Sequence, residues 1–365
     1  MRAIISGGGT AGHINPALAT AGRLAKEHQA DILFIGTKKG LESTLVPKAG
    51  WDIRYIEVSG LVRRLTLQNV LVIKQFITAI SHCKKIIKEF RPDVVIGTGG
   101  YVCAPVLFAA HALGIPTLVH EQNVIPGVTV KMTAKTADSV CISFPETTSY
   151  LKPACAKKCV LTGNPIREEM LTISKEAARK KLNLDNRPFI VSFGGSLGAE
   201  RLNQAAIDFL NKEKTGKLQF LLGTGQRYYD TVKSAVTNYD PAISVVPYIE
   251  NMDTVMAAAD LVIGRAGALT VSELCALGKP SILVPSPNVA HDHQTYNAKS
   301  VETAGGAVLI PDAEFSGETL SLAITELLNH PRRLTKMSEN AKNIGIVDGA
   351  KRICDVACRL SNILQ

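Results

Sequence analysis

A short glycine-rich segment with one carboxylate has the residue types that most clearly suggest chemistry. Residues 264–278 read GRAGALTVSELCALG, in which small residues run into an apolar-periodic helix that contains Glu273. The unpaired N–H groups and partial positive charge of a helix start bind anions, and small residues let a diphosphate approach them. A carboxylate accepts two hydrogen bonds and so suits the 2′- and 3′-hydroxyls of a ribose. The segment predicts a binding site for a nucleotide sugar. The alternative is an ordinary βα turn in which Glu273 is a solvated acid.

A second glycine-rich loop, GGGTAG, lies near the N-terminus and is followed by His13. It fits the G-x-G-x-x-G pattern, but residues 36–39 read GTKK after the second expected strand, so the acid that would bind the ribose of NAD is missing. NAD is disfavoured, and NADP remains open. We place His13 just ahead of a helix with Asn15 as its N-cap and Pro16 as its first residue. A helix start favours neutral imidazole, so His13 is a candidate base; a histidine that only bonds the loop is the alternative.

Three further polar segments are expected at the carboxyl ends of strands, where open α/β folds bind ligands. GTGGY (97–101) and HEQN (120–123) each follow an apolar run, although either could serve loop packing. Ser196, in GGSLG, is placed to donate to a phosphate or to cap a helix. In AHDHQTYNA (290–298), Asp292 and Gln294 suit sugar hydroxyls, while His-x-His leaves a metal site conceivable.

Composition narrows the functional classes. The sequence contains no Asp-x-Asp, the paired acids that would hold a divalent metal for a diphosphate. A metal-bound diphosphate is therefore disfavoured, and helix dipoles would bind the diphosphate instead. The eight cysteines include no C-x-x-C pair, which favours free thiols in a reducing compartment over zinc. We expect no signal peptide and no membrane-spanning segment, because the apolar runs are too short.

The net charge of +9 lies entirely in one half of the chain. Residues 1–163 contain 19 Lys+Arg and 10 Asp+Glu, a difference of +9, whereas residues 164–365 contain 22 of each. Within residues 61–91, seven Lys or Arg accompany one acid, Glu89. We predict that Ile73, Phe76, Ile77, Ile80 and Ile87 face a core. The remaining apolar and basic side chains suit a membrane surface, with a solvated basic helix as the alternative; they include Leu61, Arg63, Arg64, Leu67, Leu71 and Lys74.

The elements that position these segments form two cycles of strand, glycine-rich loop and helix. Strands are predicted at 3–6, 32–35, 94–97, 117–119 and 140–142, and again at 188–193, 218–222, 244–246, 261–263, 281–284 and 307–310, with helices such as 103–113 between them. The alternation indicates parallel sheets covered on both faces. Residues 161–167, LTGNPIR, read as the linker, and residues 331–364 as helical.

In combination, GGGTAGH, GTGGY, HEQN, GNPIR, GGSLGA, GRAGALTVSEL and DHQTYNA resemble the MurG family. Its members are UDP-N-acetylglucosamine transferases that act on lipid-linked muramyl-pentapeptide in peptidoglycan synthesis. The resemblance implies a GT-B fold, with two Rossmann-like α/β domains facing across a cleft. It also implies inversion at the anomeric carbon without a metal or other cofactor. We expect domains at 1–163 and 164–340, with a C-terminal helix near 341–365 packing back on the first.

By motif position, the resemblance implies a set of donor-binding residues: Thr10, Ala11, Gly12, Asn123, Arg167, Ser196, Ile249, Ala268, Leu269, Thr270, Val271, Ser272, Glu273 and Gln294. His13, Tyr101 and Glu121 would lie on the acceptor side, with His13 the candidate base. The partners implied are UDP-N-acetylglucosamine, an undecaprenyl-linked acceptor and the anionic inner leaflet, at the cytoplasmic face of the cell membrane, with no nucleic acid. The alternatives are another GT-B enzyme, such as an epimerase or a glycolipid glycosyltransferase, and a non-catalytic nucleotide-binding module.

Overall fold

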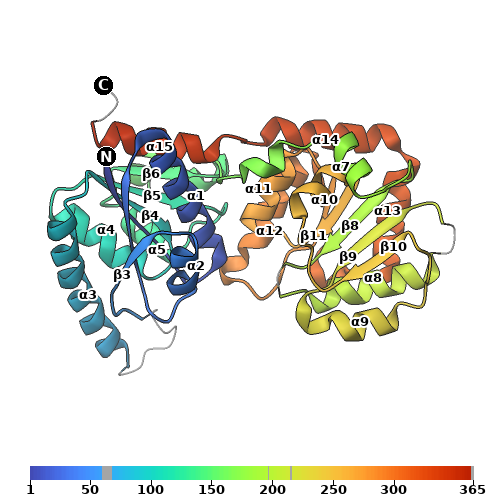
Figure 1. The fold of residues 1–365 in the computed structure, drawn as a ribbon, viewed down its shortest axis with the longest axis horizontal. Coiled ribbons are helices and arrows are strands. Elements are labelled where there is room, and N and C mark those ends of the chain that lie inside the picture. The colour runs from blue at the N-terminus through green and yellow to red at the C-terminus, as the bar shows by residue number, and fades with distance from the viewer. Residues whose placement is uncertain (60–67, 196, 214–215, 363–365) are drawn as a thin grey trace. The chain divides into compact units, whose positions relative to one another are not determined.

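The computed structural model describes residues 1–59, 68–195, 197–213 and 216–362, without the side chains of residues 68–73. It divides the chain into two compact units (Figure 1). The N-terminal unit comprises Met1–Pro165 with Asp348–Gln365, and the C-terminal unit comprises Ile166–Val347. The predicted membrane-facing residues Leu61, Arg63, Arg64 and Leu67, the side chain of Leu71, and Ser196 lie outside the described residues.

The N-terminal unit is built on a seven-stranded parallel sheet of order β3-β2-β1-β4-β5-β6-β7. Its strands are β1 (Arg2–Gly7), β2 (Asp31–Gly36), β3 (Asp52–Tyr55), β4 (Val94–Gly99), β5 (Thr117–Glu121), β6 (Ser139–Ile142) and β7 (Cys159–Leu161). Its helices are α1 (Ala11–His28), α2 (Glu42–Lys48), α3 (Gln68–Phe90), α4 (Cys103–Ala112), α5 (Val128–Thr133), α6 (Pro153–Ala156) and α15 (Gly349–Leu360), with a 3-10 turn η1 (Pro145–Tyr150).

Strand alternation explains why both faces of this sheet are covered. Along β1, Ala3 and Ile5 pack on the face that α1 and α15 cover, and Ile4 packs on the face that α3 and α4 cover. The last helix contributes fully buried side chains to the first of these cores, including Ile353 and Ala357. The C-terminal end of the chain therefore belongs to the N-terminal core.

The C-terminal unit repeats the plan with a six-stranded parallel sheet of order β10-β9-β8-β11-β12-β13. The strands are β8 (Phe189–Phe193), β9 (Gln219–Gly223), β10 (Ile243–Val246), β11 (Leu261–Gly264), β12 (Ser281–Leu283) and β13 (Ala307–Leu309). The α-helices are α7 (Lys175–Lys181), α8 (Glu200–Lys212), α9 (Tyr229–Ala235), α10 (Met252–Ala258), α11 (Ala268–Ala276), α12 (His293–Thr303), α13 (Gly317–Asn329) and α14 (Pro331–Ile344). The 3-10 turns are η2 (Glu168–Leu171), η3 (Gln226–Tyr228), η4 (Ala290–Asp292) and η5 (Asp312–Glu314).

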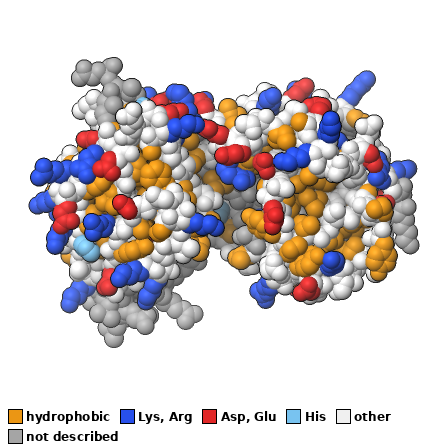
Figure 2. Space-filling view, in the orientation of Figure 1, with side chains coloured by type: hydrophobic (Ala, Val, Ile, Leu, Met, Phe, Trp, Pro, Cys, Tyr) orange, Lys and Arg blue, Asp and Glu red, His pale blue; other side chains and the backbone are white. Residues whose placement is uncertain are grey.

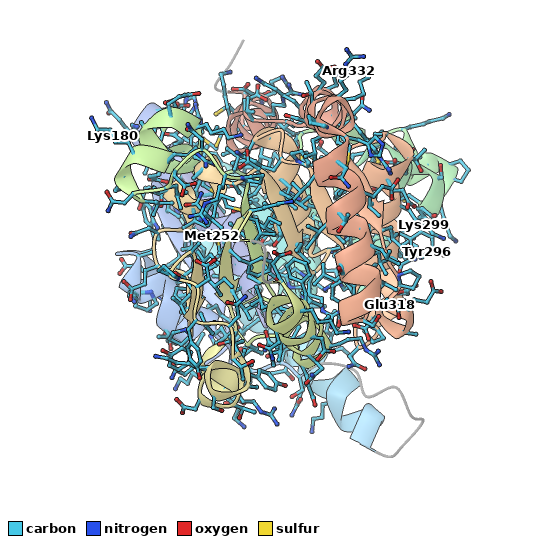
Figure 3. All side chains as sticks on the ribbon, turned by 90° about the vertical axis from the view of Figure 1, so that its right-hand side faces the viewer. Lys180, Met252, Tyr296, Lys299, Glu318 and Arg332 are labelled. Atoms are coloured by element: carbon cyan, nitrogen blue, oxygen red, sulfur yellow. The ribbon has the colours of Figure 1, made fainter. Side chains whose placement is uncertain are left out.

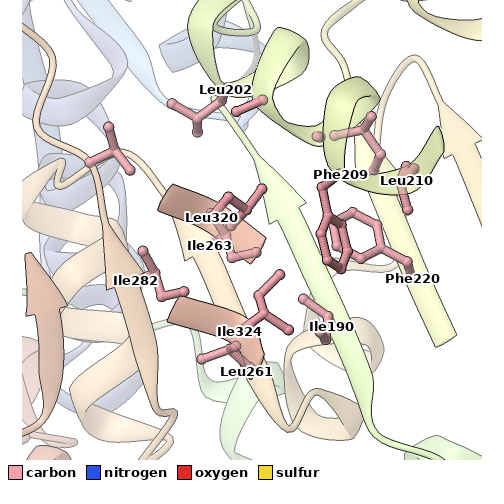
Figure 4. Close-up of a cluster of buried hydrophobic side chains, with 14 of the residues drawn as sticks. Ile190, Leu202, Phe209, Leu210, Phe220, Leu261, Ile263, Ile282, Leu320 and Ile324 are labelled. Carbon is pink, nitrogen blue, oxygen red and sulfur yellow. The ribbon is translucent and has the colours of Figure 1, made fainter. Parts of the chain in front are cut away.

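One core of this unit joins a sheet face to two helices. Ile190, Leu261 and Ile263 from the strands meet Leu202 of α8 and Leu320 of α13 (Figure 4). Each of these five side chains is almost completely buried. In each unit the strand order changes direction between the unit's first and fourth strands. These switch points lie between β1 and β4 and between β8 and β11.

Two predicted features of the helices were wrong. Helix α1 begins at Ala11, with Thr10 as its N-cap and Pro16 inside it, because Gly9 turns with φ of +82° and lets the helix begin at once. Ile77 on α3 is 63% exposed rather than in a core, where Ala79 and Cys83 lie instead.

The C-terminal region predicted as helical, 331–364, forms two helices, α14 and α15. A Cβ at Gly345 would lie 2.5 Å from the carbonyl oxygen of Cys275, so the chain passes too close to α11 for a side chain. The sequence reading also omitted β3, and it placed Leu161 in the linker although this residue ends β7.

Candidate functional site

The carboxyl ends of β1 and β4 bring two predicted segments of the N-terminal unit together. The N–H of Gly8 donates to the carbonyl of Gly99 at 3.3 Å. The ring of His13 lies against Gly99, since a Cβ there would lie 2.8 Å from His13 Cδ2. A Cβ at Gly9 would lie 3.7 Å from Tyr101 Cε1. His13 and Tyr101 therefore share one edge of the sheet, at its switch point.

His13 lies in the first turn of α1 rather than ahead of it. Its Nδ1 lies 3.0 Å from the carbonyl oxygen of Gly8 and 3.3 Å from Thr10 Oγ1. A carbonyl can only accept, so the bond to Gly8 places the hydrogen on Nδ1. In neutral imidazole this makes Nε2 the acceptor nitrogen, which is the form a general base needs.

The first turn of α1 also contains the predicted donor residues Thr10, Ala11 and Gly12. Thr10 and Ala11 are exposed and Gly12 is half-buried. The first N–H groups of a helix have no intrahelical partner. This turn can therefore donate backbone hydrogen bonds to a ligand.

Glu121, the second candidate on the acceptor side, is buried and bonded within its own loop. Its Oε1 accepts from the backbone N–H of Asn123 at 2.9 Å and from Asn123 Nδ2 at 3.2 Å. Its Oε2 accepts from the N–H of Gly127 at 2.8 Å. Burial raises the pKa of Glu121, and these hydrogen bonds oppose that rise. The geometry suits Glu121 to holding the half-buried Asn123 in place.

The HEQN segment does not simply follow a strand, because His120 and Glu121 are the last residues of β5. The His120 ring is buried, with Nε2 3.1 Å from Ser143 Oγ and 3.2 Å from the carbonyl oxygen of Gly163. Burial lowers the pKa of His120 to about 4. Gln122 Nε2 donates to the carbonyl of Thr98 at 2.9 Å. Three of the four residues therefore pack the sheet edge, and only Asn123 is half-buried.

The C-terminal unit has a cavity of about 1030 Å³ at the carboxyl ends of its strands. Predicted donor residues Thr270 and Gln294 both line it. The glycine-rich turn after β8 and the N-cap of α11, Gly267, form other parts of its wall. A nucleotide diphosphate in this cavity would meet the N-terminus of α11, which is the position expected from the sequence.

The predicted residues along α11 divide by exposure. The side chains of Ala268 and Val271 are buried, so these two residues can offer a ligand only backbone groups. Leu269 and Ser272 are half-buried, as are Thr270 and Glu273.

Glu273 follows Thr270 by three residues and so lies on the same face of α11. Its side chain is 21% exposed, and its Oε1 lies 3.8 Å from Nε of Arg167. Burial raises the pKa of Glu273, and the Arg167 charge opposes that rise. An ion pair this long with an exposed arginine contributes little to stability.

Gln294 and Ile249, two predicted donor residues, differ in the groups that they could offer a ligand. Gln294 Oε1 accepts from the N–H of Ser286 at 2.8 Å, which leaves the two amide N–H donors for a ligand in the cavity. The Ile249 side chain is buried against Gly223, so only its backbone is suited to pairing with a base.

Sequence reasoning missed an ion-pair network that lines the cavity. Asp312 accepts from Arg265 Nη1 at 2.5 Å and pairs with Arg201 Nε at 3.2 Å. The same Arg265 nitrogen lies 3.1 Å from the carbonyl oxygens of Val284 and Pro285. Arg265 stands inside the GRAGALT segment, so the arginine was visible in the sequence, but its pairing with Asp312 was not.

The His-x-His segment is arranged for a turn. His291 and Asp292 are exposed and have φ of +55° and +50°, and His293 Nδ1 bonds the carbonyl of Ala290 at 2.8 Å. Among the residues that the structure describes, no three His, Cys, Asp or Glu side chains are grouped as metal ligands.

Comparison with known proteins matches both units to one enzyme class. The glycosyltransferase family 28 N-terminal domain matches residues 3–142, and the C-terminal domain of that family matches residues 189–353. The UDP-N-acetylglucosamine--N-acetylmuramyl-(pentapeptide) pyrophosphoryl-undecaprenol N-acetylglucosamine transferase of Acetivibrio thermocellus is 48% identical over 360 residues, covering 98% of this chain and 97% of that protein. The protein of the same name from Clostridioides difficile is 40% identical, covering 100% of this chain and 90% of that protein.

The chain belongs to this transferase family, the MurG family. The solved structure of Acinetobacter baumannii MurG superposes with a TM-score of 0.82 at 28% identity, over 98% of this chain and 99% of that one. A UDP-GlcNAc 2-epimerase from Neisseria meningitidis superposes with a TM-score of 0.68 at 14% identity, which shows only that the fold is shared. The predicted fold class, α/β of the GT-B type, and the predicted class of enzyme, a glycosyltransferase, are confirmed.

Proposed function

We propose that this MurG-family chain transfers N-acetylglucosamine from UDP-N-acetylglucosamine to the muramyl sugar of undecaprenyl-pyrophosphoryl-N-acetylmuramyl-pentapeptide. The product would be the β-1,4-linked disaccharide lipid used in peptidoglycan synthesis. The observation that carries the proposal is the 48% identity over nearly the whole chain to a transferase of that name. The donor cavity at α11 and the histidine at the β1/β4 switch point supply groups for such a reaction.

In this proposal the C-terminal unit holds the nucleotide. The N-terminus of α11 supplies positive charge for the diphosphate, and the group of Arg201, Arg265 and Asp312 in the cavity wall adds a net positive charge. Glu273 accepts from the ribose hydroxyls, and the Gln294 amide donates to the sugar. Stabilising the diphosphate as it leaves is the main electrostatic task, because negative charge builds up there in the transition state.

The N-terminal unit supplies the acid–base chemistry. His13 Nε2 takes the proton of the attacking muramyl hydroxyl, whose oxygen then bonds the anomeric carbon as the UDP oxygen leaves with the electron pair. One displacement of this kind inverts the configuration. The bond from Nδ1–H to the Gly8 carbonyl orients the ring and stabilises the imidazolium that forms.

The test is UDP release from UDP-N-acetylglucosamine with and without a lipid-linked muramyl-pentapeptide analogue. We expect release only with the acceptor, with N-acetylglucosamine recovered on it. Release without acceptor together with an epimerised sugar would indicate an epimerase. Binding of UDP without release in either arm would indicate a nucleotide-binding module.

We also propose that the N-terminal unit docks on the anionic inner leaflet of the cell membrane. Val128 is 53% exposed, and it lines a cavity of about 370 Å³ with Met132, Tyr150 and three lysines, Lys131, Lys135 and Lys152. Ile77 and Lys74 on α3 are exposed as well. Figure 2 shows Lys and Arg side chains along the edge of the N-terminal unit that α3 occupies in Figure 1.

Apolar side chains beside lysines favour reversible binding to an anionic surface, with about 1 kcal/mol from each basic residue. No described helix is both long enough and apolar enough to cross a bilayer. The proposal combines this surface with the predicted segment of residues 61–74.

Vesicle sedimentation tests the docking proposal. An Arg63→Glu, Arg64→Glu, Leu67→Ser variant should lose binding to anionic vesicles, and high salt should weaken wild-type binding. A charge-matched control, Lys180→Glu with Arg332→Glu, changes two residues that project from the C-terminal unit in Figure 3. If the first variant binds anionic vesicles as wild type does, residues 61–74 are not the docking segment.

A further inference from the structure

Glu42, at the start of α2, is a buried carboxylate that the reaction described above does not use. Only 1% of its surface is exposed. Its Oε2 accepts from the N–H of Gly9 at 3.0 Å. Its Oε1 accepts from the N–H of Thr37 at 3.0 Å and from Thr37 Oγ1 at 2.7 Å. The carboxylate therefore joins the loop after β1 to the loop after β2.

Three glycines make room for this carboxylate. A Cβ at Gly8, Gly36 or Gly40 would lie 2.7, 2.7 and 2.1 Å from atoms of Glu42. Contacts this short do not occur in folded proteins, so the two loops fit around the Glu42 side chain. A carboxylate needs several donors when it is buried, and this position supplies three.

The bond to Gly9 fixes the peptide group that orients His13. The N–H of Gly9 and the carbonyl of Gly8 belong to the same planar peptide unit. Glu42 holds the N–H end, and the carbonyl end accepts from His13 Nδ1. Because glycine tolerates many backbone conformations, this peptide could rotate if the carboxylate were absent. Rotation would remove the acceptor that keeps the hydrogen on Nδ1.

The bond to Thr37 fixes the direction of a second contact. Thr37 has one hydroxyl hydrogen, which it donates to Glu42 at 2.7 Å. Tyr101 must therefore donate in its 3.4 Å contact with Thr37 Oγ1. This is a long bond, but it leaves the tyrosine oxygen with acceptor lone pairs for a substrate hydroxyl.

We propose that Glu42 is a positioning residue that sets the orientation of both His13 and Tyr101. This inference rests on the proposed transfer reaction, in which these two side chains act on the acceptor. Glu42 itself touches neither substrate, and it acts through the Gly8–Gly9 peptide and the Thr37 hydroxyl.

Glu42→Gln is the first test, with transfer to the acceptor analogue and UDP binding measured on the same protein. Glutamine replaces one acceptor oxygen by an NH2 group, which then faces an N–H or O–H donor. We expect kcat to fall at least tenfold, as for loss of a hydrogen bond to a charged group, while the Kd for UDP stays within twofold. UDP lacks the sugar and is proposed to bind the other unit, so an unchanged Kd shows that the effect of the substitution is confined to the N-terminal unit.

Thr37 variants keep the inference testable if Glu42→Gln fails to fold. Thr37→Val should lower kcat about threefold to tenfold, and Thr37→Ser, which keeps the hydroxyl, should restore it. In a double-mutant cycle, adding Tyr101→Phe to Thr37→Val should lower kcat less than Tyr101→Phe does alone, because the two changes remove one contact. Glu27→Gln, on the surface of α1, is the matched control and should match wild type.

The two possible failures are distinguishable. If wild type transfers no sugar in this assay, the proposed function fails. If wild type is active and Glu42→Gln has unchanged kcat, or the Thr37 and Tyr101 effects are additive, the positioning role of Glu42 is wrong.

Discussion

The two units use one local plan, a strand, a glycine-rich turn and a helix at a sheet switch point, with opposite results. In the N-terminal unit the turn after β1 is filled by the protein itself: Glu42, His13 and Tyr101 contact its glycines. In the C-terminal unit the turn after β8 borders a cavity of about 1030 Å³, and Leu197 on that turn is 83% exposed. The first turn holds side chains in fixed positions, and the second leaves room for a ligand.

The comparison teaches that strand order predicts where a ligand site lies but not which task it performs. Strand order is equivalent around both switch points. The side chains that enter the turn from other elements decide between chemistry and binding. Mutations at the filled turn should therefore change kcat, and mutations at the open turn should change the apparent affinity for the donor.

The largest effect on activity is expected for His13→Ala. Loss of a general base lowers kcat by about 10² to 10⁴, while UDP binding should be kept. Steady-state kinetics with the acceptor analogue and UDP titration measure the two quantities. Full activity in the variant would transfer the role of base to Tyr101 or Glu121. Loss of activity on adding EDTA to wild type would contradict the expected metal-free reaction.

Two glycine-to-alanine changes compare the turns directly. Gly100 and Gly195 have nearly the same φ, +83° and +86°, so alanine carries the same backbone penalty of about 1 to 2 kcal/mol at both. A Cβ at Gly100 would lie 2.3 Å from the carbonyl oxygen of Gly8, whereas at Gly195 no described residue beyond its chain neighbours lies within 4 Å. Gly100→Ala should therefore lower the free energy of unfolding by about 3 kcal/mol or more, and Gly195→Ala by the backbone penalty alone.

Denaturant unfolding of the two variants decides whether the turns differ in packing. Equal losses of stability would show that the filled turn is no more tightly packed than the open one, and the contrast between the units would then rest on the cavity alone.

Glu273→Ala tests the binding side of the comparison. Removing one charged hydrogen-bonding partner costs about 1.5 to 3 kcal/mol, so the apparent KM for the donor should rise at least tenfold with a smaller change in kcat. Glu302→Ala, on α12 of the same unit, is the matched control, because it makes the same substitution at another position. An unchanged donor KM would remove Glu273 from the ribose site.

The sequence predicted the buried strands well because a short apolar run between polar turns forms few structures other than a buried strand. It failed where partners meet only in the folded chain. Glu42 is a single acid in an unremarkable segment, and its role depends on Gly9 and Thr37 arriving from two loops. Asp312 gains its partners from α8 and from the end of β11. The early start of α1 was missed because Pro16 reads as a first residue, whereas it is the sixth residue of the helix.

The smallest expected effect is on stability, and it concerns His120, which packs in the sheet edge of the N-terminal unit and has no proposed role in the reaction. The pKa of His120 is about 4 in the folded state, below its ordinary value of 6.5, because the ring is buried. The unfolded chain therefore binds a proton first as pH falls, so the stability from neutral His120 is fully present above pH 6.5 and is lost toward pH 4. Between pH 7 and 5.5 the loss should be about 1 kcal/mol. The measurement is the free energy of unfolding of wild type and His120→Gln at both pH values, since other groups titrate equally in the two proteins. If the two proteins lose the same stability, His120 takes up its proton without unfolding, and this edge of the sheet is more open to water than the packing of β5 indicates.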